Sequence, residues 1–303
     1  MPNSKARLDH VKKIYLKFLK SQEVVSEPFR DKLGQLNNFF LPISEKIYRN
    51  YLNNKKTKII GLTGGQGSGK STISQILKII FHSYFNLNVA CFSIDDFYKT
   101  ALERRKMSNS IHPLFLTRGV PGTHDCKMLY NVLRALLKKN FKSIRIPRFD
   151  KSIDDRFKFR YWQKIQKKPD IIIFEGWCVG AKHQKYEELK KPLNILEKYE
   201  DTKLTWRKKV NNELKTSYKK IYDLIDKKIY LKVPNFKYVL KWRLLQEKKL
   251  RSRSKKKRTM NTKQIERFIM FYERLTKDML KRYQDNDFVI FIDKRHKIRS
   301  IKF

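Results

Sequence analysis

A glycine-rich segment at residues 64–71, Gly-Gly-Gln-Gly-Ser-Gly-Lys-Ser, constrains the fold more than any other part of the chain. An apolar run at Lys58 to Thr63 comes before it, and apolar residues at helical spacing follow from Lys70. The order strand, G-x-x-x-x-G-K-[ST] loop and helix is typical of a loop that binds nucleotide phosphates. The glycines let backbone N–H groups turn toward a phosphate, and the helix N-terminus adds partial positive charge. The predicted nucleotide-binding residues are Gly64, Gly65, Gln66, Gly67, Ser68, Gly69, Lys70, Ser71 and Thr72.

Three side chains around this loop have the chemistry of phosphoryl transfer. Lys70 is expected to reach the β- and γ-phosphates and to act in catalysis, and the Ser71 hydroxyl is expected to hold Mg²⁺. The buried run Ile171 to Phe174 ends in Glu175, which has the position of a carboxylate that orients Mg²⁺ through water. The sequence therefore predicts ATP and Mg²⁺ as cofactors. The alternative for Glu175 is an ordinary acid at a strand end.

The remaining pattern predicts an α/β fold, a three-layer α/β/α P-loop NTPase with a mostly parallel sheet. Short apolar runs alternate with helical stretches after residue 57, as in βαβ units. The expected strands are Lys58 to Thr63, Val89 to Ile94, Ser143 to Ile146, Asp170 to Phe174, Lys228 to Val233 and Phe288 to Ile292. The expected helices are Lys70 to Phe85, Cys126 to Lys139, Lys203 to Leu224, Phe236 to Arg251 and Thr262 to Tyr283. Residues 1–57 read as a helical N-terminal extension, and residues 58–303 as the kinase domain.

Acidic residues also end the second predicted strand, in Ser93-Ile94-Asp95-Asp96. Open α/β sheets bind ligands at the carboxyl ends of their strands. A carboxylate there can accept the proton of an attacking hydroxyl and fix its approach to the γ-phosphorus. We therefore predict Asp95 as the catalytic base, whereas Asp96, and less readily Asp95, has the alternative of capping the next turn.

The composition bears on the partners and on the location of the protein. The net charge is +42, but Lys and Arg are spread along the whole chain, which an AT-rich genome would also produce, so a nucleic-acid partner is not expected. The longest apolar runs have four to five residues, far below the ~20 that cross a bilayer. The basic N-terminus lacks the apolar core of a secretory signal, and Cys91, Cys126 and Cys178 lack metal or disulfide spacing. We expect a cytoplasmic protein without a membrane partner.

Five further motifs carry a family resemblance. They are SIDDFYKT at 93–100, RGVPGTHD at 118–125, PRFDKSIDDR at 147–156, FEGWCVGA at 174–181 and WRLLQE at 242–247. With the glycine-rich loop, they make the chain resemble the P-loop kinases of small molecules, which include uridine kinase, phosphoribulokinase and pantothenate kinase. Within these, the chain looks like the D-glycerate 3-kinase family. Plant and fungal members carry G-x-G-D-R where this chain has Asp154-Asp155-Arg156 directly, which resembles the bacterial branch and puts in doubt any detailed transfer of plant substrate contacts to residues 152–160.

The resemblance implies that Asp95 matches the catalytic acid of an S-x-D-x-F-Y motif. It also implies an acceptor site formed by Arg118, His124, Asp125, Arg148, Asp150 and Lys151. Arg and Lys can neutralise a carboxylate, while His and Asp can hydrogen-bond hydroxyl groups. The alternatives are structural: a salt bridge for Arg118 or Asp125, a helix N-terminal position for His124, and a turn for Asp150. In related kinases the region of residues 248–262, with the basic cluster Arg251 to Arg258, forms a lid over ATP; the alternative is a solvated basic loop.

The sequence therefore predicts an ATP-dependent kinase that transfers a γ-phosphoryl group to a hydroxyl, with D-glycerate as acceptor and 3-phosphoglycerate as product. Another small acceptor, such as a nucleoside or pantothenate, is the main alternative. A nucleic-acid-associated ATPase has only the net charge in its favour. A non-catalytic nucleotide-binding regulator would not need Lys70, Ser71, Asp95 and Glu175 together.

Overall fold

A computed structural model describes residues 4–23, 29–253 and 260–303. Its centre is a six-stranded sheet with the order β10-β9-β8-β1-β7-β2. The strands are β1 (Lys58–Gly64), β2 (Val89–Ser93), β7 (Ile171–Gly176), β8 (Lys227–Lys232), β9 (Phe288–Ile292) and β10 (Ile298–Lys302). Every neighbouring pair is parallel except β9 and β10. The predicted α/β/α fold with a mostly parallel sheet is confirmed.

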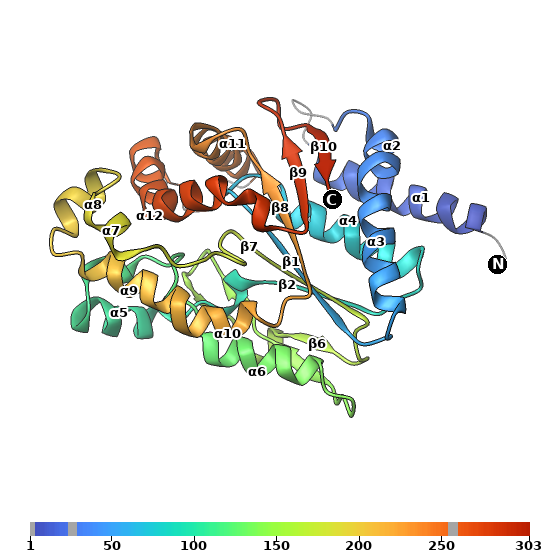
Figure 1. The fold of residues 1–303 in the computed structure, drawn as a ribbon, viewed down its shortest axis with the longest axis horizontal. Coiled ribbons are helices and arrows are strands. Elements are labelled where there is room, and N and C mark those ends of the chain that lie inside the picture. Colours follow the sequence, from blue (N-terminus) through green and yellow to red (C-terminus); the bar gives the residue numbers. More distant parts are fainter. Residues whose placement is uncertain (1–3, 24–28, 254–259) are drawn as a thin grey trace.

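The strands form this sheet because both of their faces are apolar. Alternate residues of a strand point to opposite faces, so Ile59 of β1 enters one core while Ile60 enters the other. Such strands are covered by helices on both sides, as is typical of parallel sheets. Figure 1 shows this arrangement, with β1 in the middle of the sheet and helices on either side.

Different helices cover the two faces of the sheet. One core contains residues of α1 (Ser4–Gln22), α3 (Leu41–Leu52), α4 (Lys70–Ser83) and α11 (Phe236–Arg253). The other contains residues of α6 (Cys126–Leu136), α9 (Thr205–Glu213) and α10 (Lys219–Tyr222). α12 (Thr262–Lys281) contributes to both, through Ile265 and Ile269 on one side and Phe271 and Leu275 on the other. The other helices are α2 (Lys32–Gln35), α5 (Ala101–Ser110), α7 (Tyr186–Lys190) and α8 (Ile195–Glu200).

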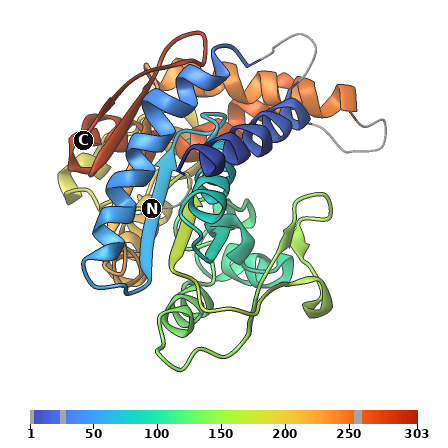
Figure 2. The ribbon, with the colours of Figure 1, turned by 90° about the vertical axis from the view of Figure 1, so that its right-hand side faces the viewer.

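The N-terminal region is helical, as predicted. Its buried side chains, among them Val11, Leu19 and Ile43, share a core with Leu77 and Phe81 of α4. Figure 2 shows these blue helices lying over α4. In this structure they form part of the layer that covers one face of the sheet.

Two predictions about the elements were wrong in detail. Ser143 to Ile146 was expected in the main sheet, but β3 (Ile144–Ile146) pairs antiparallel with β6 (Gln163–Ile165) in a separate small sheet. The helix expected from Lys203 to Leu224 begins at Thr205 and contains a π-helical turn at Leu214–Tyr218 between α9 and α10. β3 has only three residues and a half-buried pattern, so it lacks the two apolar faces of a central strand.

A second small hairpin lies beside β3 and β6. It consists of β4 (Phe149–Asp150) and β5 (Asp155–Arg156), and residues 151–154 connect these two strands. The segment from β3 to β6 projects from the main body in Figure 2. This projection brings the hairpin to the carboxyl end of the sheet, where it meets the segment after β2.

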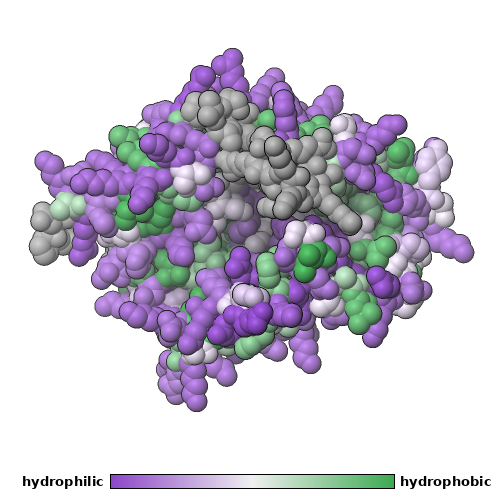
Figure 3. All heavy atoms as spheres, turned by 180° about the vertical axis from the view of Figure 1, so that it is seen from behind, coloured by the Kyte–Doolittle hydropathy of each residue, from purple (hydrophilic) through white to green (hydrophobic). Residues whose placement is uncertain are grey.

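The surface is mainly hydrophilic. On the face shown in Figure 3, the apolar side chains form small separate groups among charged and polar ones. Among the described helices, none is both long and apolar enough to cross a bilayer. Cys91 and Cys178 are buried free thiols, and Cys126 is half-buried.

Candidate active site

The glycine-rich loop connects β1 to α4, as its sequence predicts. Gly67 and Gly69 have φ angles of 74° and 93°, a left-handed conformation that favours glycine. A Cβ on Gly67 would also lie 2.9 Å from the Cβ of Trp242 in α11. A Cβ on Gly69 would meet nothing within 4 Å, so the loop is open on that side. The loop thus packs against α11 and presents its backbone to an open space at the start of α4.

Lys70 spans the loop from the first turn of α4. Its Nζ donates to the carbonyl oxygens of Gly64 and Gly65, each at 3.0 Å. Burial lowers the pKa of Lys70, while Glu175 and Asp95 act to raise it. Its ammonium group thus interacts electrostatically with both carboxylates that the sequence identified.

Ser71 and Glu175, the two predicted metal ligands, contact each other. The Ser71 hydroxyl donates to Glu175 Oε1 at 3.1 Å, across 104 residues of sequence. Burial raises the pKa of Glu175, and the neighbouring Lys70 ammonium opposes that rise. One hydroxyl and one carboxylate at the mouth of the loop are the expected protein ligands of a Mg²⁺ ion that also binds phosphate and water.

The side chains at the loop suit a Mg²⁺ ion that is bound together with phosphate oxygens and water. The described residues contain no cluster of three His, Cys, Asp or Glu side chains for a metal, so a cation here would need phosphate oxygens and water to complete its shell. Within the described part of the chain, Ser68 Oγ and Gln66 Oε1 are buried and have no hydrogen-bond partner. Buried polar atoms are normally paired, and a hydroxyl in this loop is suited to a phosphate oxygen.

The two aspartates after β2 have different environments. Asp96 Oδ2 accepts from the Ser93 backbone N–H at 3.1 Å in a capping box, so it stabilises the turn Ile94–Phe97. Asp95 points instead toward the site, where Tyr98 Oη donates to Oδ1 at 2.9 Å and Lys151 Nζ donates to Oδ2 at 2.6 Å. Burial acts to raise the pKa of Asp95, but the Lys151 ammonium and these hydrogen bonds outweigh it and lower the pKa to about 2. Asp95 is thus ionised and aimed between the loop and the hairpin.

His124 lies inside an aromatic stack behind Asp95. Its ring stacks on Tyr98 at 4.5 Å between centroids, and its Nδ1 lies 2.5 Å from Tyr218 Oη. Burial lowers the pKa of His124 to about 3, so the ring is neutral at ordinary pH. The structure therefore places His124 behind Tyr98, where it supports the hydroxyl that binds Asp95.

The other predicted acceptor residues are not all in one place. Lys151 and Arg118 lie at the hairpin, where Asp154 forms ion pairs with both Arg118 and Arg104. Asp125 caps α6 by accepting from the Met128 backbone N–H at 2.9 Å.

Arg148 and Asp150 are also taken up by local contacts. Arg148 is exposed, with its guanidinium 5.4 Å from the centre of the Phe157 ring. Asp150 Oδ1 accepts from the Ser152 backbone N–H at 2.9 Å, as in a turn. The structure thus brings Lys151 to Asp95 and gives Arg118 an ion pair with Asp154, which was its structural alternative. Asp150 forms the turn that was its alternative. Asp125 lies 3.7 Å from Arg156, as in its salt-bridge alternative, and also caps a helix.

Sequence reasoning missed four residues of this region, namely Tyr98, Arg104, Asp154 and Tyr272. Tyr98 was inside a quoted motif, and its place three residues after Asp95 on a tight turn was a usable signal. Tyr272 Oη donates to the Arg118 carbonyl at 3.2 Å, and a Cβ on Gly119 would lie 1.9 Å from it. Tyr272 is 154 residues from Arg118, so no local pattern could have identified it.

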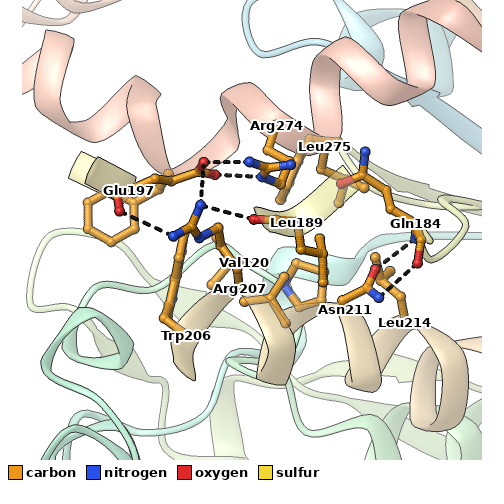
Figure 4. Close-up of a pocket in the computed structure, with 14 residues that line it drawn as sticks. Val120, Gln184, Leu189, Glu197, Trp206, Arg207, Asn211, Leu214, Arg274 and Leu275 are labelled. Atoms are coloured by element: carbon orange, nitrogen blue, oxygen red, sulfur yellow. Dashed lines mark hydrogen bonds and ion pairs between the residues drawn. The ribbon is translucent and has the colours of Figure 1, made fainter. Parts of the chain in front are cut away.

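A small cavity lies behind the segment Val120-Pro121, away from Asp95. Figure 4 shows it between α8, α9 and α12, lined by Trp206, Leu214, Leu275 and an ion-pair network of Glu197, Arg207 and Arg274. Its volume is about 30 Å³, which suits one or two water molecules. It is therefore too small to be an acceptor site.

The predicted lid at residues 248–262 lies partly outside the described residues, which leave out 254–259. Its flanks are ordered helices. α11 continues to Arg253, and α12 begins with a capping box in which Asn261 Oδ1 accepts from the Gln264 backbone N–H at 2.9 Å. The basic cluster itself, with the lid function assigned to it, remains a prediction.

Comparisons with known proteins agree with this geometry. Residues 59–213 match the Phosphoribulokinase / Uridine kinase family. The chain is 34% identical over 233 residues to an uncharacterised kinase of Schizosaccharomyces pombe, an alignment that covers 71% of this chain and 78% of the relative. It is 31% identical over 247 residues to the chloroplastic D-glycerate 3-kinase of Arabidopsis thaliana, which covers 71% of this chain and about half (51%) of that enzyme.

Solved structures share the fold. The protein YGR205w superimposes with a TM-score of 0.69 and 28% identity, covering 86% of this chain and 95% of that one. D-glycerate 3-kinase of Cryptococcus neoformans superimposes with a TM-score of 0.71 and 24% identity, covering 88% and 98%. The likeness extends over nearly the whole of both structures.

The family match begins with β1 and includes the glycine-rich loop, Asp95 and Glu175. P-loop kinases of this kind use ATP together with Mg²⁺. The chain therefore belongs to the phosphoribulokinase/uridine kinase family and is an ATP- and Mg²⁺-dependent P-loop kinase.

Proposed function

We propose that this kinase transfers the γ-phosphoryl group of ATP to a hydroxyl of a small hydroxy acid, and that this acceptor is D-glycerate, which becomes 3-phosphoglycerate. The observation that carries the proposal is the position of Asp95. It lies between the phosphate loop, whose Lys70 interacts electrostatically with it, and the cationic hairpin, whose Lys151 contacts it at 2.6 Å.

Asp95 is ionised and is placed to act as the base of this transfer. A carboxylate that is ionised and fixed by two hydrogen bonds can accept the acceptor's proton and orient its oxygen toward the γ-phosphorus. Lys70 would bind the phosphate oxygens, and Ser71 and Glu175 would hold Mg²⁺, which neutralises charge on the phosphates when bound. Lys70 and Ser71 come from the first turn of α4, Glu175 comes from the end of β7, and Asp95 comes from the turn after β2.

The acceptor is proposed to be an acid because the side chains beyond Asp95 are cationic. Lys151 and Arg118 both face this region, and a guanidinium binds a carboxylate well. The Arabidopsis relative is a D-glycerate 3-kinase, which supports the same acceptor. Uridine kinase of Streptococcus mutans and pantothenate kinase of Coxiella burnetii also match, at 32% and 31% identity over 41% and 39% of this chain, so a nucleoside or pantothenate remains the alternative acceptor.

The first test is ADP release with Mg²⁺-ATP and a panel of acceptors: D-glycerate, L-glycerate, pantothenate, uridine, RNA and none. We expect turnover with D-glycerate alone. Asp95→Asn keeps the size of the side chain but removes the base, so kcat should fall roughly 100-fold or more while ATP still binds.

Asp96→Asn is the matched control, because Asp96 Oδ2 only caps a turn. It should retain far more activity than Asp95→Asn. Turnover with uridine or pantothenate instead of D-glycerate would refute the proposed acceptor. Hydrolysis stimulated by RNA would favour a nucleic-acid-associated ATPase, and an Asp95→Asn protein with normal kcat would refute the role of Asp95.

A further inference from the structure

Asp154, in the loop of the β4–β5 hairpin, connects two guanidinium groups beside the acceptor site. Its Oδ2 accepts from Arg104 at 2.8 Å, and its Oδ1 forms an ion pair with Arg118. Arg104 also donates to the Asp154 backbone carbonyl at 2.8 Å. The Arg104 side chain is 1% exposed, whereas that of Asp154 is 47% exposed. A buried cation is thus balanced by a carboxylate at the rim of the site.

Both guanidiniums also pack on one ring. Their central carbons lie 5.7 Å (Arg104) and 5.5 Å (Arg118) from the centre of the Phe149 ring. Tyr98, which binds Asp95, meets the same ring edge-on at 5.2 Å. Phe149 and Asp154 therefore hold the two arginines next to the residue that is proposed to activate the acceptor.

Cations outnumber carboxylates in the ion-paired cluster beside the acceptor site. Three cations, Arg104, Arg118 and Lys151, face two carboxylates, Asp95 and Asp154. Asp125 and Arg156 are oppositely charged neighbours at 3.7 Å, and His124 is neutral. Lys70 and Glu175 belong to the phosphate side and compensate each other. Asp96 and Asp155 lie outside these ion pairs and act on Lys151 and Arg104 through space. The ion-paired cluster itself has one cation more than it has carboxylates, and this excess charge is available to an acceptor.

We infer that Asp154 is a specificity-determining residue that sets this balance, so that the site selects acceptors with a single negative charge. The inference rests on the proposed function, which it deepens. A dianion would bring one negative charge more than the cations can neutralise, and an uncharged acceptor would leave a guanidinium without its partner; both cost binding energy in a partly desolvated site.

The backbone at this position suits an aspartate less than a glycine. Asp154 has a φ of 58°, in the left-handed region, where Asp and Asn are tolerated and most other side chains are strained. The residue is thus held in an uncommon conformation while its carboxylate binds two arginines. Asn fits the same conformation and volume without the charge, which makes Asp154→Asn a direct probe.

The experiment compares two competitive inhibitors of D-glycerate phosphorylation, glycolate with one carboxylate and tartronate with two. In the wild type, the inhibition constant of glycolate should be lower than that of tartronate. Asp154→Asn removes one negative charge, so the ratio of the two inhibition constants should shift by about tenfold or more toward tartronate. Asp154→Gly, which suits a positive φ, should give the same shift and replaces Asp154→Asn if that protein does not fold.

Asp155→Asn is the matched control. It removes the same charge from the next residue of the hairpin, whose carboxylate accepts from the Arg156 backbone N–H at 2.7 Å. Asp155 acts on Arg104 through space, but it is not the carboxylate that pairs with Arg104 and Arg118. An unchanged ratio in Asp154→Asn, or an equal shift in Asp155→Asn, would overturn the inference.

Failure of the proposed function would look different. If the wild type does not turn over D-glycerate, the proposed acceptor is wrong. The ratio of the dissociation constants of glycolate and tartronate is then measured by calorimetric titration, with a non-hydrolysable ATP analogue and Mg²⁺ present. A shift toward tartronate in Asp154→Asn would still support the role of Asp154. Absence of binding of both carboxylates to the wild type would overturn it.

Discussion

At the scale of single residues, the neighbours of a carboxylate decide its chemistry. Asp95 and Asp96 are adjacent in sequence, yet burial raises the pKa of Asp96, whereas Lys151 and Tyr98 lower that of Asp95 to about 2. The difference arises because Asp96 turns back to cap its own segment, while Asp95 faces a cation that is 56 residues away in the sequence. A base that stays ionised throughout the working range of pH is the result.

Replacing Lys151 by Met should change this pH dependence. The wild-type carboxylate loses its charge only as the pH falls through about 2, so kcat should not show an acid limb from Asp95 in the usual range. Without the Lys151 ammonium, the effect of burial on Asp95 is no longer outweighed, so the pKa of Asp95 rises. In Lys151→Met, kcat at saturating acceptor should therefore begin to fall below about pH 5. The measurement is the pH profile of kcat for both proteins.

Lys151→Arg is the control, because it keeps the positive charge beside Asp95. Its profile should follow that of the wild type, even if KM for the acceptor changes. Identical profiles for the wild type and Lys151→Met would contradict the electrostatic role of Lys151.

At the scale of elements, buried ion pairs join helices that are distant in sequence. Glu197 of α8 binds Arg274 of α12 at 2.7 Å and lies 3.5 Å from Arg207 of α9, which also pairs with Asp201 at 2.8 Å. The Glu197 carboxylate is 1% exposed. Figure 4 shows it beside the guanidinium groups of Arg207 and Arg274. This network fixes α12 against the segment that precedes α9, and α12 supplies Tyr272 to the carbonyl of Arg118.

Glu197→Gln should therefore destabilise the protein strongly. It keeps the volume of the side chain but leaves two buried guanidiniums without one of their carboxylates, which costs about 3 kcal/mol or more of unfolding free energy. Glu200→Gln, on the same helix, breaks only an exposed pair with Arg267 and should cost less than about 1 kcal/mol. Urea unfolding of the two variants measures the difference, and equal costs would show that the network does not stabilise the fold.

At the scale of the whole molecule, the N-terminal helices and the nucleotide-binding layer share one core. Leu19 of α1 is 2% exposed and belongs to the same cluster as Leu77 and Phe81 of α4, the helix that carries Lys70 and Ser71. The boundary predicted near residue 57 therefore separates two sequence patterns that share one core. Unfolding of the N-terminal helices should expose the back of the nucleotide site.

Leu19→Ala should lower the melting temperature of the entire protein in a single transition, at a cost of about 2 kcal/mol or more. Leu16→Ala, on the same helix but 36% exposed, should have little effect. Calorimetry and loss of ATP turnover, followed on the same temperature ramp, should coincide. Two separate transitions, with the kinase transition unchanged in Leu19→Ala, would instead support an independent N-terminal unit.

The elements and the loop that depend only on neighbouring residues could be predicted from the sequence alone. The glycine-rich loop and the strands β1, β2, β7, β8 and β9 follow from local patterns, because strand and helix periodicity and the φ preferences of glycine act over a few residues. The positions of Asp95 and Glu175 at strand ends follow from the same patterns, while their catalytic roles stay predictions. The Ser71 to Glu175 contact is consistent with local rules, because Glu175 ends β7 and Ser71 follows the loop after β1, and these two parallel strands are neighbours.

Only the tertiary structure decided which charges meet. The sequence assigned Arg118, His124, Asp125, Arg148, Asp150 and Lys151 to the acceptor site. In the structure, Lys151 meets Asp95, Arg118 shares Asp154 with Arg104, and His124 lies behind Tyr98. The small sheet of β3 and β6 precedes and follows the hairpin that makes these contacts. The sequence predicted a strand at β3 but neither β6 nor the pairing between them. Ion pairs between residues 36 to 56 positions apart depend on how the chain folds back on itself, because no periodicity connects their partners.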